Sequence, residues 1–165
     1  MGPDVIRGLP AHILLVHLVL AAVPLAALLL VLFAVWPAAR RRIGIVMPIV
    51  ALGALITVPI TTHAGEWLQR RLPNTAAIRH HVALGLQMKY WMVGFFVVAL
   101  LVWAWDVASR REHPASNIIH GTAGHVVVAI VAIGISVGAM QQLVRTGEAG
   151  SRAVWTGKYS SQQLR

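Results

Sequence analysis

The 165-residue chain contains no cysteine and few charged residues. The absence of cysteine excludes disulfide bonds, thiolate metal ligands and a cysteine nucleophile. Lys, Arg, Asp and Glu make up only 12% of the residues, whereas 58% are hydrophobic. A soluble domain usually has about 25% charged residues. Acidic residues are the scarcest charged class, at five against fourteen Lys and Arg, and the formal net charge is +9. These proportions indicate an integral membrane protein.

Several catalytic motifs are missing as well. No glycine-rich nucleotide-binding loop, Ser–His–Asp arrangement or paired-carboxylate motif occurs, so nothing in the sequence favours an enzyme. The basic residues suit loops beside lipid headgroups, where each basic side chain near an anionic surface contributes about 1 kcal/mol of attraction. We therefore interpret the positive charge as a sign of a lipid bilayer partner rather than of nucleic-acid binding.

The longest apolar run covers residues 11–36 and has no Lys, Arg, Asp or Glu in 26 residues. As a helix it would extend about 39 Å, more than the roughly 30 Å of a bilayer's hydrocarbon core. It is longer than the apolar part of a signal peptide, which has about 7–15 residues. It also has only Arg7 as a basic flank. We therefore expect this run to stay in the protein as its first membrane span.

Polar stretches divide the rest of the chain into three further apolar segments. The four predicted spans cover residues 11–36, 43–62, 82–105 and 118–142. Their short connections favour antiparallel neighbours. The sequence thus predicts an all-α fold, a transmembrane four-helix bundle of two helical hairpins that forms one membrane domain over residues 1–165.

The connections predict the orientation. The short turns at 37–42 and 106–117 contain five Lys and Arg, and the two tails with the long loop contain eight. Because the positive-inside rule gives most weight to short turns, we place the turns inside and both termini outside. We expect the triplet Arg40–Arg42 to act first as a signal for this orientation and second as a contact site for lipid headgroups. A short interfacial turn is expected from Glu66, and a surface tail from Leu143.

Each predicted hairpin opens with histidine and closes with Gly-Glu. The first opens with His12 and His17 and closes at Gly65–Glu66, and the second opens with His80 and His81 and closes at Gly147–Glu148. This pattern suggests a duplicated hairpin whose two copies are related by an axis along the membrane normal.

Five of the eight histidines fall on the terminal side of the predicted spans: His12, His17, His63, His80 and His81. Neutral imidazoles from neighbouring helices can hold a haem iron axially, or bind a transition metal together with a carboxylate. We select His17, His63 and His81 as candidate cofactor ligands, because His17 lies deeper in its span and the other two flank the covering loop. A metal site would add Glu66 and His80. The alternative is that these histidines only end helices and form hydrogen bonds across them.

On the turn side, His120 and His125 lie on one predicted helix, about 140° apart around its axis, so they cannot clamp one haem together. The sequence therefore predicts at most one haem with two axial histidines, near the terminal side.

Two pairs of charged residues lie near the same side, Lys89 with Glu66 and Glu148 with Arg145. We interpret them as interfacial ion pairs in preference to proton-relay groups.

Several segments resemble one family of bacterial membrane proteins. They are LPAHILLVHLVLAAVPLAALLLVL, T-x-A-G-E, I-R-H-H-V-A-L-G and R-T-G-E-A-G-S-R-A-V-W. Together they are similar to the domain-of-unknown-function 2231 family, over about Leu9 to Gly157. The resemblance implies four spans in a bacterial cytoplasmic membrane. Related domains fused to exported redox-type domains imply termini outside. The chain departs from the usual H-P-x-x-V-H-F-P opening and has Glu148 where the family often has His. The family implies an architecture rather than an activity.

These observations support three functional hypotheses. The first is a redox module that binds haem b or a transition metal through His17, His63 and His81. The second is a non-catalytic accessory subunit of a larger membrane complex, without a cofactor. The third and weakest is a small transporter or proton channel that uses Lys89 and Glu66. The spacing of Gly134-x-x-x-Gly138 lets helices approach closely and would suit a homo-oligomer or a larger complex.

Overall fold

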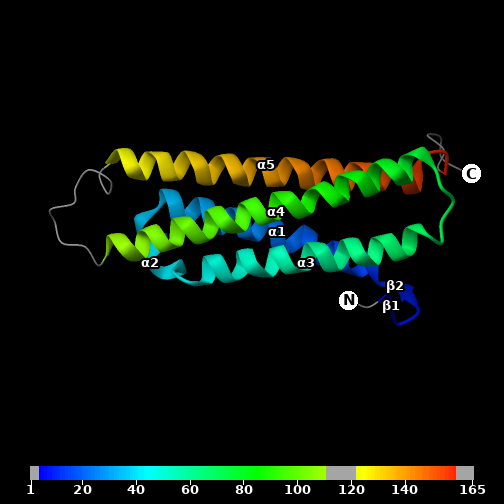
Figure 1. Cartoon of the computed structure of the whole chain (residues 1–165), viewed down its shortest axis with the longest axis horizontal. Helices are drawn as coiled ribbons and strands as arrows, with labels where there is room; N and C mark the ends of the chain where they lie inside the picture. The colour runs from blue at the N-terminus through cyan, green and yellow to red at the C-terminus, as the bar shows by residue number, and fades with distance from the viewer. Residues whose placement is uncertain (1–3, 111–121, 159–165) are drawn as a thin grey trace, which may run out of the picture.

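The computed structural model describes residues 4–110 and 122–158. In these ranges the chain forms four long helices, one short helix and a small hairpin of two strands (Figure 1). The helices are α1 (Ala11–Val35), α2 (Pro37–Ile43), α3 (Val46–Gln69), α4 (Ala76–Ser109) and α5 (Thr122–Trp155), and the strands are β1 (Val5–Ile6) and β2 (Leu9–Pro10). Of the described helices, α1, α3, α4 and α5 are long and apolar enough to cross a membrane. The predicted all-α fold with four candidate spans is confirmed.

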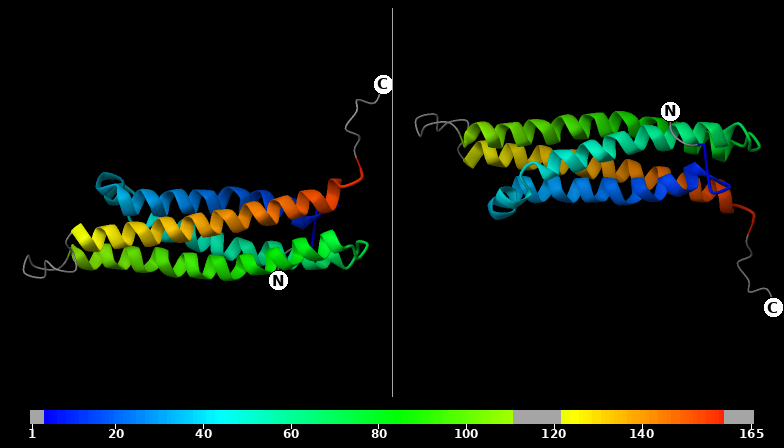
Figure 2. Two further views of the ribbon diagram at one scale, coloured as in Figure 1. Left: turned by 90° about the horizontal axis from the view of Figure 1, so that it is seen from above. Right: turned by 90° about the horizontal axis from the view of Figure 1, so that it is seen from below.

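The four long helices lie side by side along the length of the molecule, as the three views agree (Figures 1 and 2). Helix α1 packs against α3 and α5, and α4 packs against the same two helices. The order around the bundle is therefore α1–α3–α4–α5. Helices α1 and α4 face each other across one diagonal, and α3 and α5 across the other. The hairpins α1–α3 and α4–α5 thus pack side by side.

Helix α1 shows how the bundle buries its core. Val19, Val23, Leu30 and Phe33 recur at helical spacing and are almost completely buried. The opposite face is also apolar, since residues such as Leu25 are about half exposed. A helix that is apolar all round is suited to lipid on its outer face, because the hydrocarbon chains are as apolar as the core.

The described helices extend well beyond the predicted apolar segments at one end. Helices α4 and α5 each have 34 residues, which corresponds to about 51 Å against a hydrocarbon core of roughly 30 Å. Glu66, expected in a separate turn, lies in the last turns of α3, and the segment from Leu143, expected as a tail, continues α5 to Trp155. Hydropathy marks only the part of a helix in lipid, whereas the helical hydrogen bonds continue into the polar region.

The small hairpin precedes α1 directly. Arg7 and Gly8 form its turn with φ values of 50° and 80°, which is typical of a tight two-residue turn. The backbone N–H of Ala11 donates to the carbonyl of Asp4 at 3.0 Å. This hairpin, the α3–α4 loop and the last turns of α5 lie at one end of the bundle, which we call the terminal end (Figure 1). The opposite end, with α2, is the turn end.

Candidate functional site at the terminal end

Two histidines meet inside the terminal end. His12 lies in the first turn of α1 and His81 in the second turn of α4. Their ring centroids are 6.1 Å apart, and the ring planes are inclined at 72°. Both side chains are half-buried. Because α1 and α4 face each other across the bundle, this contact joins the two hairpins.

Each imidazole is oriented by a backbone carbonyl of its own hairpin. His12 Nδ1 lies 3.0 Å from the carbonyl oxygen of Thr61 in α3, and His81 Nδ1 lies 3.0 Å from that of Thr146 in α5. A carbonyl oxygen only accepts, so Nδ1 is the donor in both rings and Nε2 of a neutral ring keeps its lone pair. An imidazole whose Nδ1–H is bound in this way is pre-oriented to bind a metal ion through Nε2.

A glycine supports each ring one helical turn after the accepting threonine. A Cβ atom on Gly65 would lie 2.9 Å from His12 Nδ1, and a Cβ on Gly150 would lie 3.0 Å from His81 Cε1. Both distances are shorter than normal carbon contacts, so only glycine leaves room for the rings where they lie. The pattern Thr-x-x-x-Gly occurs at the same place in both hairpins.

The matching contacts define a twofold internal repeat. His12 corresponds to His81, and Thr61–Gly65 corresponds to Thr146–Gly150. The same offsets align the buried residues of the paired helices. In α1 and α4 these are Val19 with Met88, Val23 with Met92, Ala26 with Phe95, Leu30 with Ala99 and Phe33 with Val102. In α3 and α5 they are Met47 with Ala132, Ala51 with Ser136, Ala54 with Ala139, Val58 with Leu143 and Ala64 with Ala149.

The register of this repeat differs from the one that the sequence suggested. The structural equivalent of Gly65 is Gly150, three residues after Gly147. His63, two residues before Gly65, therefore corresponds to Glu148, which is itself a member of the second Gly-Glu pair. The contact of each glycine with an imidazole ring decides the alignment, and this contact cannot be read from the sequence.

The structure does not bring the predicted cofactor ligands together. Of the three cofactor candidates only His81 lies in the histidine pair. His17 is exposed, and its Nδ1 donates to the carbonyl of Ile13 in its own helix at 2.7 Å. His63 and His80 are exposed.

The described ranges 4–110 and 122–158 contain no group of three or more His, Cys, Asp or Glu residues placed to hold a metal ion. The five candidates for a metal site, His17, His63, Glu66, His80 and His81, are therefore not assembled into one. His12, which the sequence analysis placed at the correct end but did not select, is the partner of His81. The recurrence of Thr-x-x-x-Gly was the signal that could have identified it.

The charged residues near the pair form local ion pairs. Lys89 Nζ lies 3.7 Å from Glu66 Oε1 and connects α4 with α3, with both side chains a little over one third exposed. Glu148 lies 3.9 Å from Arg152, one turn along α5, so the ion pair that Glu148 forms is with Arg152 rather than with the expected Arg145.

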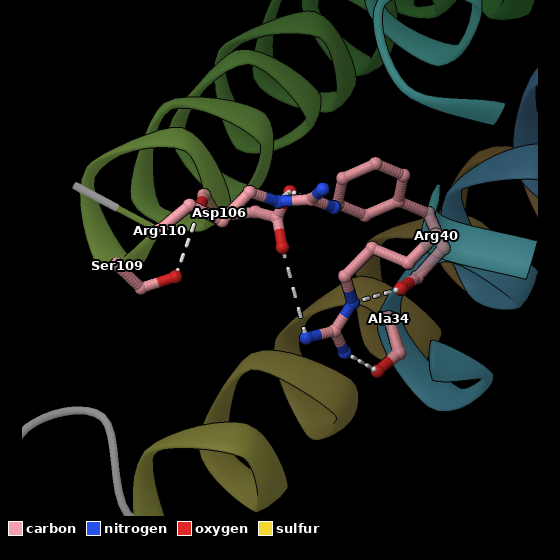
Figure 3. A network of polar contacts seen from close by, with 6 residues as sticks. Ala34, Arg40, Asp106, Ser109 and Arg110 are labelled. Carbon is pink, nitrogen blue, oxygen red and sulfur yellow. Dashed lines mark hydrogen bonds and ion pairs between the residues drawn. The ribbon is translucent and has the colours of Figure 1, made fainter. Parts of the chain in front are cut away.

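The turn end contains a buried charged network instead (Figure 3). Arg40 Nε donates to the carbonyl of Phe33 at 2.9 Å, and its Nη2 donates to that of Ala34 at 2.7 Å. Its Nη1 lies 4.0 Å from Asp106 Oδ1, while Arg110 donates to Asp106 Oδ2 at 2.9 Å. Arg40 thus caps the carbonyls that end α1. The expectation that it faces lipid headgroups is wrong, because its side chain is buried.

Two further sequence candidates lie near the α4–α5 contact. Gly138 packs directly against the ring of Trp91, whereas Gly134 has open space beside it. His125 lies against Trp105, with ring centroids 4.9 Å apart. His113 and His120 lie outside the described residues.

A model of the family described as "Predicted membrane protein (DUF2231)" matches residues 8–163. The match includes both helical hairpins and both histidines of the pair. Searches of curated proteins and of solved structures gave no match.

Proposed function

The chain belongs to the DUF2231 family of predicted membrane proteins, and from that premise we propose that it is a membrane redox module. In this proposal His12 and His81 hold one haem b at the terminal end. We also propose, from the charge distribution of the loops, that this end faces outward from a bacterial cytoplasmic membrane.

The histidine pair is the observation that carries the proposal. Two imidazoles from opposite helices lie 6.1 Å apart, and each has its Nδ1 occupied by a backbone carbonyl. Two metal–nitrogen bonds of about 2 Å each, together with the two ring radii, require a separation of roughly 6 Å. The distance between the ring centroids therefore matches the separation that two nitrogen ligands of one metal ion require.

The donor set favours haem over a free metal ion. Zinc sites usually take at least three protein ligands, and the described residues offer no such group. A haem iron is held within its macrocycle and needs only axial ligands from the protein. Two histidines are therefore sufficient for haem b, whereas they would leave a zinc ion incompletely coordinated.

The chain's own residues would orient and tune the site. The carbonyls of Thr61 and Thr146 accept from Nδ1 and so hold the tautomer in which Nε2 keeps its lone pair. Gly65 and Gly150 let the rings lie against the helix backbone. A bound haem would supply one-electron transfer.

A visible absorption spectrum of the detergent-purified full chain, oxidised and then reduced with dithionite, tests the proposal. We expect a Soret band and sharp bands in the reduced state, with one iron per chain. His12→Ala and His81→Ala should each abolish them. His17→Ala and His63→Ala are matched controls, since both residues are exposed at the same end, and they should leave the spectrum unchanged.

Two results would contradict the assignment. A featureless spectrum without stoichiometric iron means that the pair only joins the hairpins, which favours an accessory subunit of a larger complex. Loss of the spectrum in His17→Ala but not in His12→Ala would return the ligand role to the set selected from the sequence.

A further inference from the structure

The outermost turns of the terminal end carry an excess of positive charge. Exposed Lys and Arg residues lie at the end of α3, in the first turn of α4, at the end of α5 and in the turn of the small hairpin (Figure 1). In the ranges 4–110 and 122–158, Glu148 is the only exposed acid. We call the six basic residues together the basic surface: Arg7, Arg70, Arg71, Arg79, Arg152 and Lys158.

Most of this charge is not neutralised within the described part of the chain. The guanidinium of Arg71 lies 3.7 Å from the centre of the Trp67 ring and donates to the carbonyl of Trp67 at 2.8 Å. Arg79 donates to the backbone and side-chain oxygens of Asn74, both at 3.1 Å. These partners are neutral, so they orient the two arginines and leave their charge in place. Among the six described residues of the basic surface, Arg152 alone has an acidic partner, Glu148 at 3.9 Å.

The basic surface lies beyond the lipid headgroups. Lys89 is the last charged residue before the apolar run of α4, and Arg145 is the first after that of α5, so both mark the edge of the hydrocarbon core. Arg79 lies ten residues before Lys89, about 15 Å along the helix. Arg152 lies seven residues after Arg145, about 10 Å along the helix. Each headgroup layer is only about 5–8 Å thick, so these arginines are accessible to a partner in water.

The same surface covers the histidine pair. Arg79 lies two residues before His81 in α4, and Arg152 lies two residues after Gly150, the glycine that supports the His81 ring. Two residues correspond to about 3 Å along a helix. A partner bound to the basic surface would therefore lie directly above any centre that the two imidazoles hold.

We propose that the basic surface binds a water-soluble, acidic protein that carries one electron. This inference rests on the proposed function and deepens it, because it names the class of partner that exchanges electrons with the module. One electron passes between the two proteins, so one is reduced as the other is oxidised, and no proton or atom is transferred.

The chemistry of the surface suits such a partner. Complexes between electron-transfer proteins bury little area and are weak, and complementary charge steers the two proteins together and sets their orientation. The basic surface offers positive charge on oriented side chains, next to the site where the electron would be held. A phospholipid offers the same negative charge, but its headgroup stays at the level of Lys89 and Arg145.

Titration calorimetry of the full chain in a non-ionic detergent tests the surface. The probe is an acidic plant-type ferredoxin, a water-soluble carrier of one electron. We expect saturable binding of one ferredoxin per chain at low ionic strength. The affinity should fall about tenfold or more when salt is raised from about 20 mM to about 200 mM, because exposed charges are screened.

A matched pair of double variants locates the binding site. Arg70→Gln combined with Lys158→Gln removes two charges of the basic surface, and neither side chain has a hydrogen bond or an ion pair with another described residue. This variant should bind about threefold to tenfold more weakly. Arg41→Gln combined with Arg42→Gln removes the same charge from exposed positions at the turn end. It should bind like the unaltered chain.

Three results would overturn the inference. The first is the absence of saturable binding by the unaltered chain. The second is equal weakening in both double variants, which would mean that only net charge matters. The third is binding in phosphatidylcholine nanodiscs that is lost in nanodiscs with about one third phosphatidylglycerol, which would assign the basic surface to anionic headgroups.

The spectrum and the titration separate the two proposals. A haem spectrum without ferredoxin binding refutes only the role of the basic surface. Binding that depends on Arg70 and Lys158 in a chain without haem refutes the redox module and leaves the basic surface as a binding site for acidic proteins.

Discussion

The two ends of the bundle satisfy their polar groups in different ways. At the turn end, Asp106 forms ion pairs with both Arg40 and Arg110, and Arg40 also donates to carbonyls in the last turn of α1. At the terminal end, His12 and His81 each use one nitrogen for a backbone carbonyl and keep the other available. A saturated network is suited to holding helices together. A pair with two free lone pairs is suited to binding a ligand.

The largest effect is expected from removing the acid of the turn end. Asp106→Ala leaves Arg40 buried without its counter-charge, and breaking such a pair costs about 3 kcal/mol or more. We expect a clearly lower midpoint of thermal unfolding in detergent, followed by circular dichroism. Arg41→Ala, at the exposed neighbouring position, is the control and should change little. Equal stability of both variants would show that the buried network is not structural.

A smaller effect is expected from filling the space under a ring at the terminal end. Gly65→Ala places a methyl group against His12, and such overpacking costs about 1–3 kcal/mol. The displaced ring should also weaken retention of the haem, measured as the ratio of Soret to protein absorbance. Gly134→Ala, with open space beside it, should be neutral or slightly stabilising. If Gly65→Ala behaved like Gly134→Ala, the ring would not depend on this contact.

The internal repeat predicts equal effects for the two histidines in the cofactor-free protein. His12→Ala and His81→Ala each remove one hydrogen bond to a carbonyl, a loss of about 1 kcal/mol in the free energy of unfolding. The comparison uses unfolding midpoints of protein purified without haem. A loss confined to one variant would show that the two hairpins do not depend on equivalent hydrogen bonds between histidine and carbonyl.

The smallest effect is expected for the ion pair beside the histidines. Lys89→Gln removes the contact with Glu66, which is partly exposed and screened by salt, so stability should fall by less than about 1 kcal/mol. The difference from the unaltered chain should shrink further in high salt. A salt-independent loss of several kcal/mol would place this pair in the same class as the buried network at the turn end.

Much of the architecture was predictable because the hydropathy of a segment determines whether it can lie in the lipid bilayer. The apolar runs located the four spans, and the polar interruptions placed His12 and His81 at one end. The choice between His12 and His17 was not predictable in the same way. They are five residues apart, about 140° around the helix, so only one can face the interior. Depth favoured His17, whereas helix rotation selected His12.

Arg40 illustrates a second limit of the sequence. Within the triplet Arg40–Arg42 nothing in composition distinguishes one arginine from the next, and all three suit a membrane interface. The structure buries Arg40 alone, because α2 turns it toward the end of α1 and toward Asp106. That acid is 66 positions further along the chain, so the pairing depends on how the hairpins pack.

The sequence by itself determined the membrane environment of the helices, the number of candidate spans and the end at which histidines gather. Each of these depends on the polarity of contiguous residues. Only the tertiary structure decided which imidazoles meet and which glycines support them. Those features depend on the rotation of each helix about its axis and on the pairing of distant segments.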